Sequence, residues 1–250
     1  IARAADYNFR MAIDRVFSLK GVGLIVTGMV FSGLVHTSES LVLSSNGSKV
    51  RIRGIKVNSQ TSDCAKAGER CALNITGRGI RERSIGRGNW LMHHSLYNPT
   101  KRIDVDLEVL QSEEGVLKHW TPTHLHIGSD HLPARVAILS GGGIAAGKRG
   151  LCQLVLDRDT FVCHGDRFVL RDQSARRTIA GGRVLDPFAP KNGRAKPRRV
   201  DSLAAMRGDS AAEILQKLTD QSETGVSLQQ FIVSHNLQIP KINLLITSLG

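Results

Sequence analysis

Apolar and polar residues alternate at every second position along much of the chain before residue 187. In 9–14, 50–53 and 103–109, apolar side chains are separated by charged or small ones. Successive side chains of a β-strand point to opposite faces, so this period predicts half-buried antiparallel strands. Further apolar runs of strand length lie at 135–139, 151–156, 167–170 and 178–185. The pattern predicts a mainly β protein.

Glycines divide these strands at the spacing of hairpin turns. Nine of them lie between Gly21 and Gly79, and one follows Asn46 in a turn-forming Asn-Gly pair. Short strands joined by tight turns favour closed barrels over alternating strands and helices. We therefore expect two tandem antiparallel β-barrels, the first over residues 1–96 and the second over 97–187.

The composition changes after Pro187. Residues 189–199 hold five cations, two prolines and no acidic residue, which predicts a basic linker over 188–200. Beyond it the apolar spacing becomes helical. Ser210 with Glu213 and Ser227 with Gln230 form capping-box patterns, and Pro240 suits the start of a third helix. Residues 201–250 are expected to be the beginning of a winged-helix module.

The chain is basic, and the charge is uneven. Its 250 residues contain 34 Lys and Arg against 22 Asp and Glu, a formal charge of +12. The predicted parts 1–96, 97–187 and 188–250 contribute +8, +1 and +3. Such an excess favours a polyanion such as nucleic acid as partner, with the first barrel as the main contact.

Neither a membrane span nor a disulfide framework is predicted. The longest apolar stretch, 22–31, is about half the length of a membrane-spanning helix. The four cysteines, at 64, 71, 152 and 163, have no paired or metal-ligand spacing, so we expect free, mostly buried thiols and a cytoplasmic protein. The chain opens at Ile1 with no targeting pattern, which suggests an internal piece of a longer protein.

Two glycine-rich segments invite a nucleotide-binding interpretation. Residues 142–148 satisfy G-x-x-x-x-G-K, but Arg149 stands where a phosphate loop needs Ser or Thr, and a predicted strand follows instead of a helix. Residues 21–23 likewise precede a strand. Both are expected to be turns.

Histidines and arginines supply the other candidate sites. His124 and His126 share one face of a predicted strand, where they suit either a zinc site or, with no chelate completed at familiar spacing, a structural or RNA-facing pair. No catalytic centre is visible, and we assign no metal ligand. A basic loop suits phosphate contact, specifically tRNA, with a solvated hairpin as the alternative; it contains Arg78, Arg81, Arg83 and Arg87. Aromatic residues, at 4%, are too scarce for an extended base-stacking platform.

Several segments resemble a known family. FRMAIDRVF at 9–17 and KGVGLIVTG at 20–28 resemble the opening of the second domain of translational GTPases, most closely bacterial selenocysteine-specific elongation factors. Further stretches are similar to the second and third domains of that family; they are 68–75, 87–90, 124–136 and 165–187. The resemblance covers about residues 7–187 and is specific in combination.

The resemblance implies a function. In this family two barrels hold the acceptor end and T-stem of selenocysteinyl-tRNA for delivery to the ribosome, and C-terminal winged helices bind an mRNA hairpin. The sequence contains neither the family's GTPase domain nor the mRNA-reading modules, so we expect a GTPase domain upstream in the parent protein. The chain itself is then expected to be no enzyme and to hold no cofactor, with GTP and magnesium bound by the missing domain.

The resemblance also places the family's aminoacyl pocket at Asp14, Arg15 and Arg70. A selenol is more acidic than a thiol, whose pKa is about 8.5, so selenocysteine is largely anionic at neutral pH while serine is not. Arginines therefore favour the correct amino acid. Adjacent strand residues point to opposite faces, so Asp14 and Arg15 can share one pocket only if the strand bulges there. The alternative is an exposed Arg15 beside an Asp14–Arg70 surface pair.

Two other functions remain compatible with these residues. One is the barrel pair of another translational GTPase, such as an initiation-factor subunit. The other is a barrel module of a sulfate-activating enzyme subunit. A basic linker that leads into predicted helices suits an RNA-binding extension and is unexpected in the sulfate enzyme.

Overall fold

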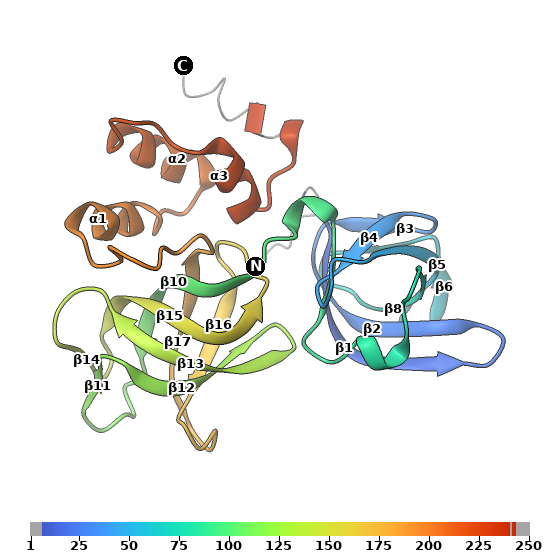
Figure 1. The fold of residues 1–250 in the computed structure, drawn as a ribbon, viewed down its shortest axis with the longest axis horizontal. Coiled ribbons are helices and arrows are strands. Elements are labelled where there is room, and N and C mark those ends of the chain that lie inside the picture. Colours follow the sequence, from blue (N-terminus) through green and yellow to red (C-terminus); the bar gives the residue numbers. More distant parts are fainter. Residues whose placement is uncertain (1–6, 241, 244–250) are drawn as a thin grey trace. The chain divides into compact units, whose positions relative to one another are not determined.

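The computed structural model describes residues 7–240 and 242–243. The chain divides into two compact units. The first contains residues up to Asn98 together with Gly128–Asp130, and the second contains Pro99–Ile127 and the residues from His131 onward. Each unit is built around a β-barrel (Figure 1).

The first barrel closes through six strands in the order β4-β9-β1-β2-β8-β5, with β5 pairing back to β4. The strands are β1 (Arg10–Leu19), β2 (Gly23–Ser32), β4 (Ser40–Leu43), β5 (Lys49–Val57), β8 (Arg70–Thr76) and β9 (Trp90–Met92). Strand β6 (Gln60–Ser62) extends β5, and β3 (Leu34–His36) pairs with β7 (Cys64–Lys66). The alternation found in the sequence places Met11, Ile13 and Ile52 in the core, each fully buried.

The second barrel closes in the order β10-β15-β13-β12-β16-β17. Its strands are β10 (Thr100–Val109), β12 (Thr121–Ile127), β13 (Asp130–Ile138), β15 (Arg149–Thr160), β16 (Arg167–Arg171) and β17 (Thr178–Asp186). A separate pair joins β11 (Val116–Lys118) to β14 (Gly143–Ala145). Residues 142–148 thus form a short strand and a turn, and β15 follows them at Arg149, so the predicted strand after Lys148 is confirmed.

Three helices follow the second barrel: α1 (Pro197–Ala205), α2 (Ala211–Asp220) and α3 (Leu228–Ser234). The predicted caps are confirmed, since Ser210 accepts a hydrogen bond from the Glu213 amide and Ser227 accepts one from the Gln230 amide. The helix predicted from Pro240 falls largely outside the described residues. In the part of the chain that the structure describes, no helix is long and apolar enough to cross a membrane.

The linker predicted over 188–200 is too long, because α1 begins at Pro197. Proline suits the first turn of a helix, where its missing amide hydrogen costs nothing. The linker's basic character is also partly neutralised. The Arg199 guanidinium lies 2.5 Å from Asp104 and 2.6 Å from Asp186, both buried carboxylates of the second barrel. Arg199 is therefore a structural residue.

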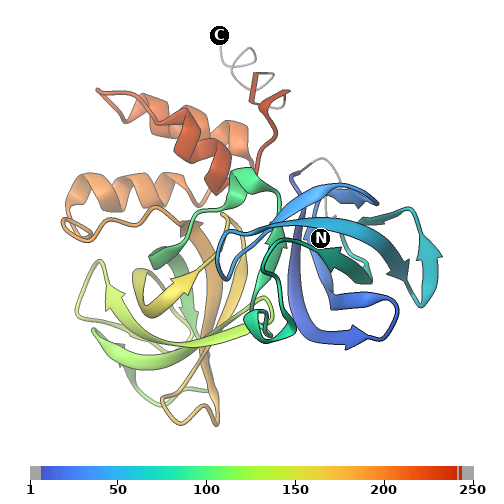
Figure 2. The ribbon, with the colours of Figure 1, turned by 45° about the vertical axis from the view of Figure 1, so that its right-hand side comes forward.

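The helical segment packs on the second barrel within the second unit (Figure 2). Leu203 of α1 is fully buried, and it forms one hydrophobic cluster with Leu139, Leu151 and Leu185. A second ion pair joins Arg207, just after α1, to Asp106 of β10 at 2.5 Å. Asp104 and Asp106 of β10 thus anchor α1 and the segment that follows it to the barrel.

Candidate functional site

Strand β1 bulges at the position that the sequence singled out. Ile13 is paired with Gly28 and Arg15 with Thr27, so the register shifts across Asp14, which has no opposite residue. Residues opposite each other in a sheet point to the same face, which places Arg15 on the face of Thr27. The Thr27 hydroxyl donates a 2.7 Å hydrogen bond to Asp14 Oδ1, so Asp14 is on that face too. The bulge that a shared site requires is present.

Arg70 completes this cluster from strand β8, which pairs with the other edge of β2. Its guanidinium binds both carboxylate oxygens of Asp14; the Nη2 to Oδ1 distance is 3.0 Å, and Nη1 contacts Oδ2. Asp14 is 26% exposed and Arg70 49% exposed. The pair lies on the outer surface of the first barrel, open to a ligand from solvent.

The electrostatics of the cluster favour an anion. Partial burial acts to raise the pKa of Asp14, but hydrogen bonds from Arg70 and Thr27 and the positive charges of Arg70 and Arg15 outweigh it, and the pKa is lowered. Asp14 is therefore ionised at neutral pH. One carboxylate against two guanidinium groups leaves a net positive charge. The arrangement can orient Arg70 and hold a small anion nearby.

Sequence reasoning missed Thr27 and Gly28. Their role depends on the register between β1 and β2, which the residue pattern alone does not reveal. A Cβ at Gly28 would lie 2.1 Å from the Ala12 carbonyl oxygen, so only glycine lets the two strands approach this closely. Gly28 itself can be seen in the sequence, but the residue that lies opposite it on β1 cannot.

The four arginines of the predicted basic loop are all exposed. The loop has defined structure: Glu82–Ser84 form a 3-10 turn, in which the Ser84 hydroxyl donates to the Arg81 carbonyl at 2.6 Å. Arg87 is held in place, since its Nε donates to the Ser129 carbonyl at 3.1 Å within the same compact unit. Arg78, Arg81 and Arg83 project from this turn region as a basic surface of the first barrel.

His124 and His126 lie on the outer face of β12, opposite Arg171 and Val169 of β16. The His126 ring stacks on His131, with ring centroids 5.8 Å apart. Among the described residues, no group of three or more His, Cys, Asp or Glu side chains is close enough to hold a metal ion. The face next to His124 is positively charged by Arg171, which is compatible with an RNA-facing role.

The four cysteines are free, as expected from their spacing. Cys71 and Cys152 are buried, and burial raises the pKa of each thiol to about 12. A thiol with such a pKa is a poor nucleophile at neutral pH because almost none of it is ionised. These two cysteines are core residues.

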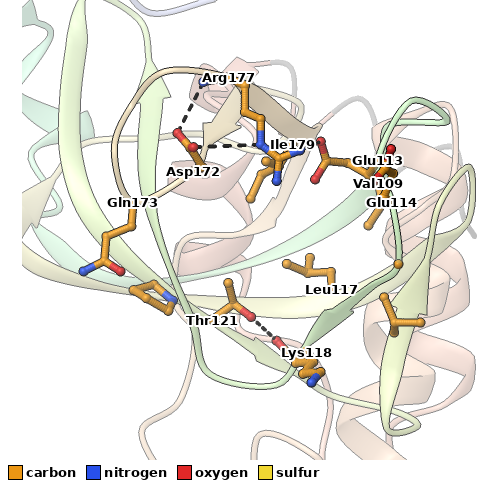
Figure 3. Close-up of a pocket in the computed structure, with 13 residues that line it drawn as sticks. Val109, Glu113, Glu114, Leu117, Lys118, Thr121, Asp172, Gln173, Arg177 and Ile179 are labelled. Carbon is orange, nitrogen blue, oxygen red and sulfur yellow. Dashed lines mark hydrogen bonds and ion pairs between the residues drawn. The ribbon is translucent and has the colours of Figure 1, made fainter.

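The second barrel has a pocket of about 390 Å³ that contains none of the predicted site residues (Figure 3). Its apolar wall includes Val109, Leu117 and Ile179. The Arg177 guanidinium reaches into it and lies 2.9 Å from Glu113 and 3.9 Å from Asp172. Three of the charged residues that line the pocket, Arg177, Glu113 and Asp172, are therefore already paired with one another.

The comparisons with known proteins agree with this architecture. The family model described as "Selenocysteine-specific elongation factor, beta-barrel domain" matches residues 100–191. The model "Elongation factor Tu domain 2" matches residues 23–92. The chain is similar to a solved bacterial selenocysteine-specific elongation factor, EF-Sec, with a TM-score of 0.73, 19% identity and coverage of 94% of this chain and 37% of that one. That structural similarity supports the fold.

Two curated relatives extend the comparison to the sequence. The selenocysteine-specific elongation factor of Escherichia coli (strain K12) is 38% identical over 213 residues, which cover 85% of this chain and 33% of the relative. That of Haemophilus influenzae is 33% identical over 245 residues, or 96% of this chain and 39% of the relative. The chain thus spans only 33% and 39% of the lengths of these two relatives. Over most of its length, and over both barrels, the chain is therefore similar to selenocysteine-specific elongation factors.

Proposed function

We propose that this chain binds selenocysteinyl-tRNA, as part of a GTP-dependent elongation factor that delivers selenocysteine to the ribosome. The observation that carries the proposal is the cluster of Asp14, Arg15 and Arg70 on one face of the first barrel, created by the bulge in β1. A selenocysteine-specific factor must hold a small anionic side chain, and this cluster has a net positive charge with guanidinium donors.

The physical basis of selectivity is the charge of the amino acid. The selenolate of selenocysteine is anionic at neutral pH, whereas the hydroxyl of serine is neutral. Arg70, held by Asp14, and Arg15 beside it would stabilise the anion through charge-assisted hydrogen bonds. The same groups gain much less from a neutral hydroxyl. Asp14 would act as a positioning residue, since it binds Arg70 and repels anions.

The tRNA body would bind through charge without sequence readout. The exposed Arg78, Arg81 and Arg83 suit phosphate oxygens. Arg87 follows them in the sequence and is held in place by its hydrogen bond to the Ser129 carbonyl. Contacts of this kind bind any tRNA equally. The family's GTP hydrolysis, with magnesium, and its mRNA hairpin recognition are proposed to belong to other domains of a cytoplasmic protein. We assign no catalytic residue to the described barrels.

The test is the ratio of affinities for selenocysteinyl-tRNA and seryl-tRNA on the same tRNA body. Both ligands offer the same phosphates, so a general loss of positive charge cancels in the ratio. Filter binding with the intact gene product should give a ratio that Arg15→Ala or Arg70→Ala lowers about ten- to a hundredfold, the effect of losing a charge-assisted hydrogen bond of about 1.5–3 kcal/mol.

Arg81→Ala is the matched control, because it removes one exposed arginine outside the cluster. It should weaken binding of both tRNAs and leave the ratio unchanged. If Arg15→Ala and Arg70→Ala keep the wild-type ratio, the cluster is a surface ion pair and the amino acid is recognised elsewhere.

A further inference from the structure

The turn between β11 and β12 contains a residue in an unfavourable backbone conformation. Trp120 has a φ of +68°. This left-handed region is ordinary for glycine or asparagine, but it is unfavourable for a residue with a bulky side chain. The turn is well defined, since the Trp120 amide donates to the Val136 carbonyl at 2.7 Å. The fold of this turn would be served better by a glycine.

Burial does not account for the tryptophan either. Trp120 is 40% exposed. The chain's other tryptophan, Trp90, is 2% exposed and packs edge-on against Phe31 in the first unit. An indole normally contributes to stability by removing a large apolar area from water. Trp120 leaves two fifths of its surface in solvent, so burial in the core does not explain its presence.

The surroundings of Trp120 are cationic. The guanidinium of Arg135 lies 5.9 Å from the ring centroid and that of Arg194 lies 5.5 Å from it. The ring of His119 is stacked at a centroid distance of 6.0 Å. Arg194 comes from the basic segment before α1, so two distant parts of the sequence bring their charges to one aromatic ring.

Trp120 also forms one wall of a groove of about 590 Å³ in the second unit. Pro122, Pro133 and Ala134 supply flat apolar surface, and His124 and Arg135 line the same groove. Among the described residues that line the groove, Asp157 is the only acidic one. The groove thus combines an exposed aromatic ring and apolar walls with adjacent guanidinium groups.

We propose that this groove binds an unpaired nucleotide of an RNA, with its base against Trp120 and its phosphate held by Arg135 and Arg194. An exposed aromatic ring beside cations is the chemistry with which proteins hold single-stranded nucleic acid. The site is separate from the aminoacyl cluster and does not depend on the amino acid.

The near-neutral charge of the second barrel is compatible with this site. Asp104 and Asp186 are paired with Arg199, and Asp106 is paired with Arg207. Two arginines thereby offset most of the charge of these three carboxylates. Arg135 lines the groove, and Arg194 lies over the Trp120 ring. A barrel with a formal charge near zero can therefore present a local positive surface to a phosphate.

The experiment is a fluorescence titration of this chain with a short unstructured RNA oligonucleotide and with a duplex of the same length. The single strand should quench the exposed indole. Trp120→Gly relieves the backbone strain, so the melting temperature of this variant should equal or exceed that of the wild type. Its affinity for the single strand should fall about five- to a hundredfold, the range expected for the loss of one stacked base. Trp120→Asn, which also suits this backbone, should give the same loss, and Trp120→Phe should retain most binding.

Arg135→Ala and Arg194→Ala should each weaken the single strand more than Arg167→Ala, an exposed arginine elsewhere on this barrel. Duplex binding should be insensitive to Trp120. The proposal is overturned if Trp120→Gly and Trp120→Asn bind the single strand like wild type, or if the indole responds to an acidic peptide and not to RNA. Trp120→Gly should leave the selenocysteinyl to seryl ratio unchanged, so failure here is distinguishable from failure of the aminoacyl cluster.

Discussion

Partial burial and three neighbouring residues act on the charge of Asp14. Arg70 and Thr27 donate hydrogen bonds to its oxygens, Arg15 adds a positive charge, and partial burial opposes ionisation. Because Arg70 is 49% exposed, water screens this pair, and it contributes little to the free energy of folding. Its consequence is positional: the carboxylate fixes where the Arg70 guanidinium lies.

The pKa of Asp14 measures this contact directly. The carboxyl should titrate below the value of an ordinary aspartate, about 3.9, and Arg70→Ala should raise its pKa because the strongest hydrogen-bond donor is lost. Since the folded-state pKa is lowered, the associated stability is present above about pH 4 and is lost as the pH falls through the folded value. NMR titration of the Asp14 carboxyl provides the measurement. An unchanged Asp14 pKa in Arg70→Ala would show that the pair does not form in solution.

At the scale of elements, the site depends on how closely β1 and β2 approach. Gly28 lies opposite Ile13, immediately before the bulge, and the Ala12 carbonyl occupies the space of a Cβ. A side chain there must push the two strands apart. The displacement would reach Thr27 and Asp14, which are held in contact by the register of this pair.

Gly28→Ala should therefore destabilise the first barrel by about 2 kcal/mol or more, within the range measured for overpacked cores. Chemical denaturation of the chain is the measurement. Gly86→Ala is the control: a Cβ there meets no atom within 4 Å, and the expected change is within about 0.5 kcal/mol. Equal stability of Gly28→Ala and Gly86→Ala would mean that β1 and β2 are less closely packed than described.

At the scale of the whole molecule, the three helices and the second barrel belong to one compact unit. Besides the ion pairs of Arg199 and Arg207, a histidine pair joins them. His164 follows β15, and its ring stacks on that of His235, at the end of α3, with centroids 4.4 Å apart. Phe231, one helical turn earlier in α3, stacks on His235 with ring centroids 4.0 Å apart. Two protonated rings at this distance would repel each other.

This packing predicts a pH dependence of stability. Burial lowers the pKa of His164 and lowers that of His235 to about 3. Below about pH 6.5 the unfolded chain binds protons that the folded chain excludes. The free energy of unfolding therefore decreases as the pH is lowered, by up to about 1.4 kcal/mol per pH unit for each histidine. Thermal unfolding between pH 7.5 and 5 should show this slope. His235→Phe keeps an aromatic ring and should flatten it, whereas an unaltered slope would place the titrating group elsewhere.

The sequence alone was sufficient to predict the two barrels and the two capped helices. Alternation with a period of two and a serine before a helix are local patterns, and each element satisfies them with its own residues. The alternation at 103–109 became β10, and Ser210 and Ser227 became the caps of α2 and α3. The apolar run at 151–156 likewise predicted β15 correctly.

The pairing of distant residues was decided by the tertiary structure alone. Asp14 and Arg70 are 56 residues apart, and only the order β1-β2-β8, with a bulge in β1, brings them together. Arg199 looked like part of an RNA-binding linker, yet it pairs with two buried acids of the barrel. The exposed ring of Trp120 was equally invisible. A residue pattern records which side chains prefer burial, but register, strand order and closure determine which of them meet.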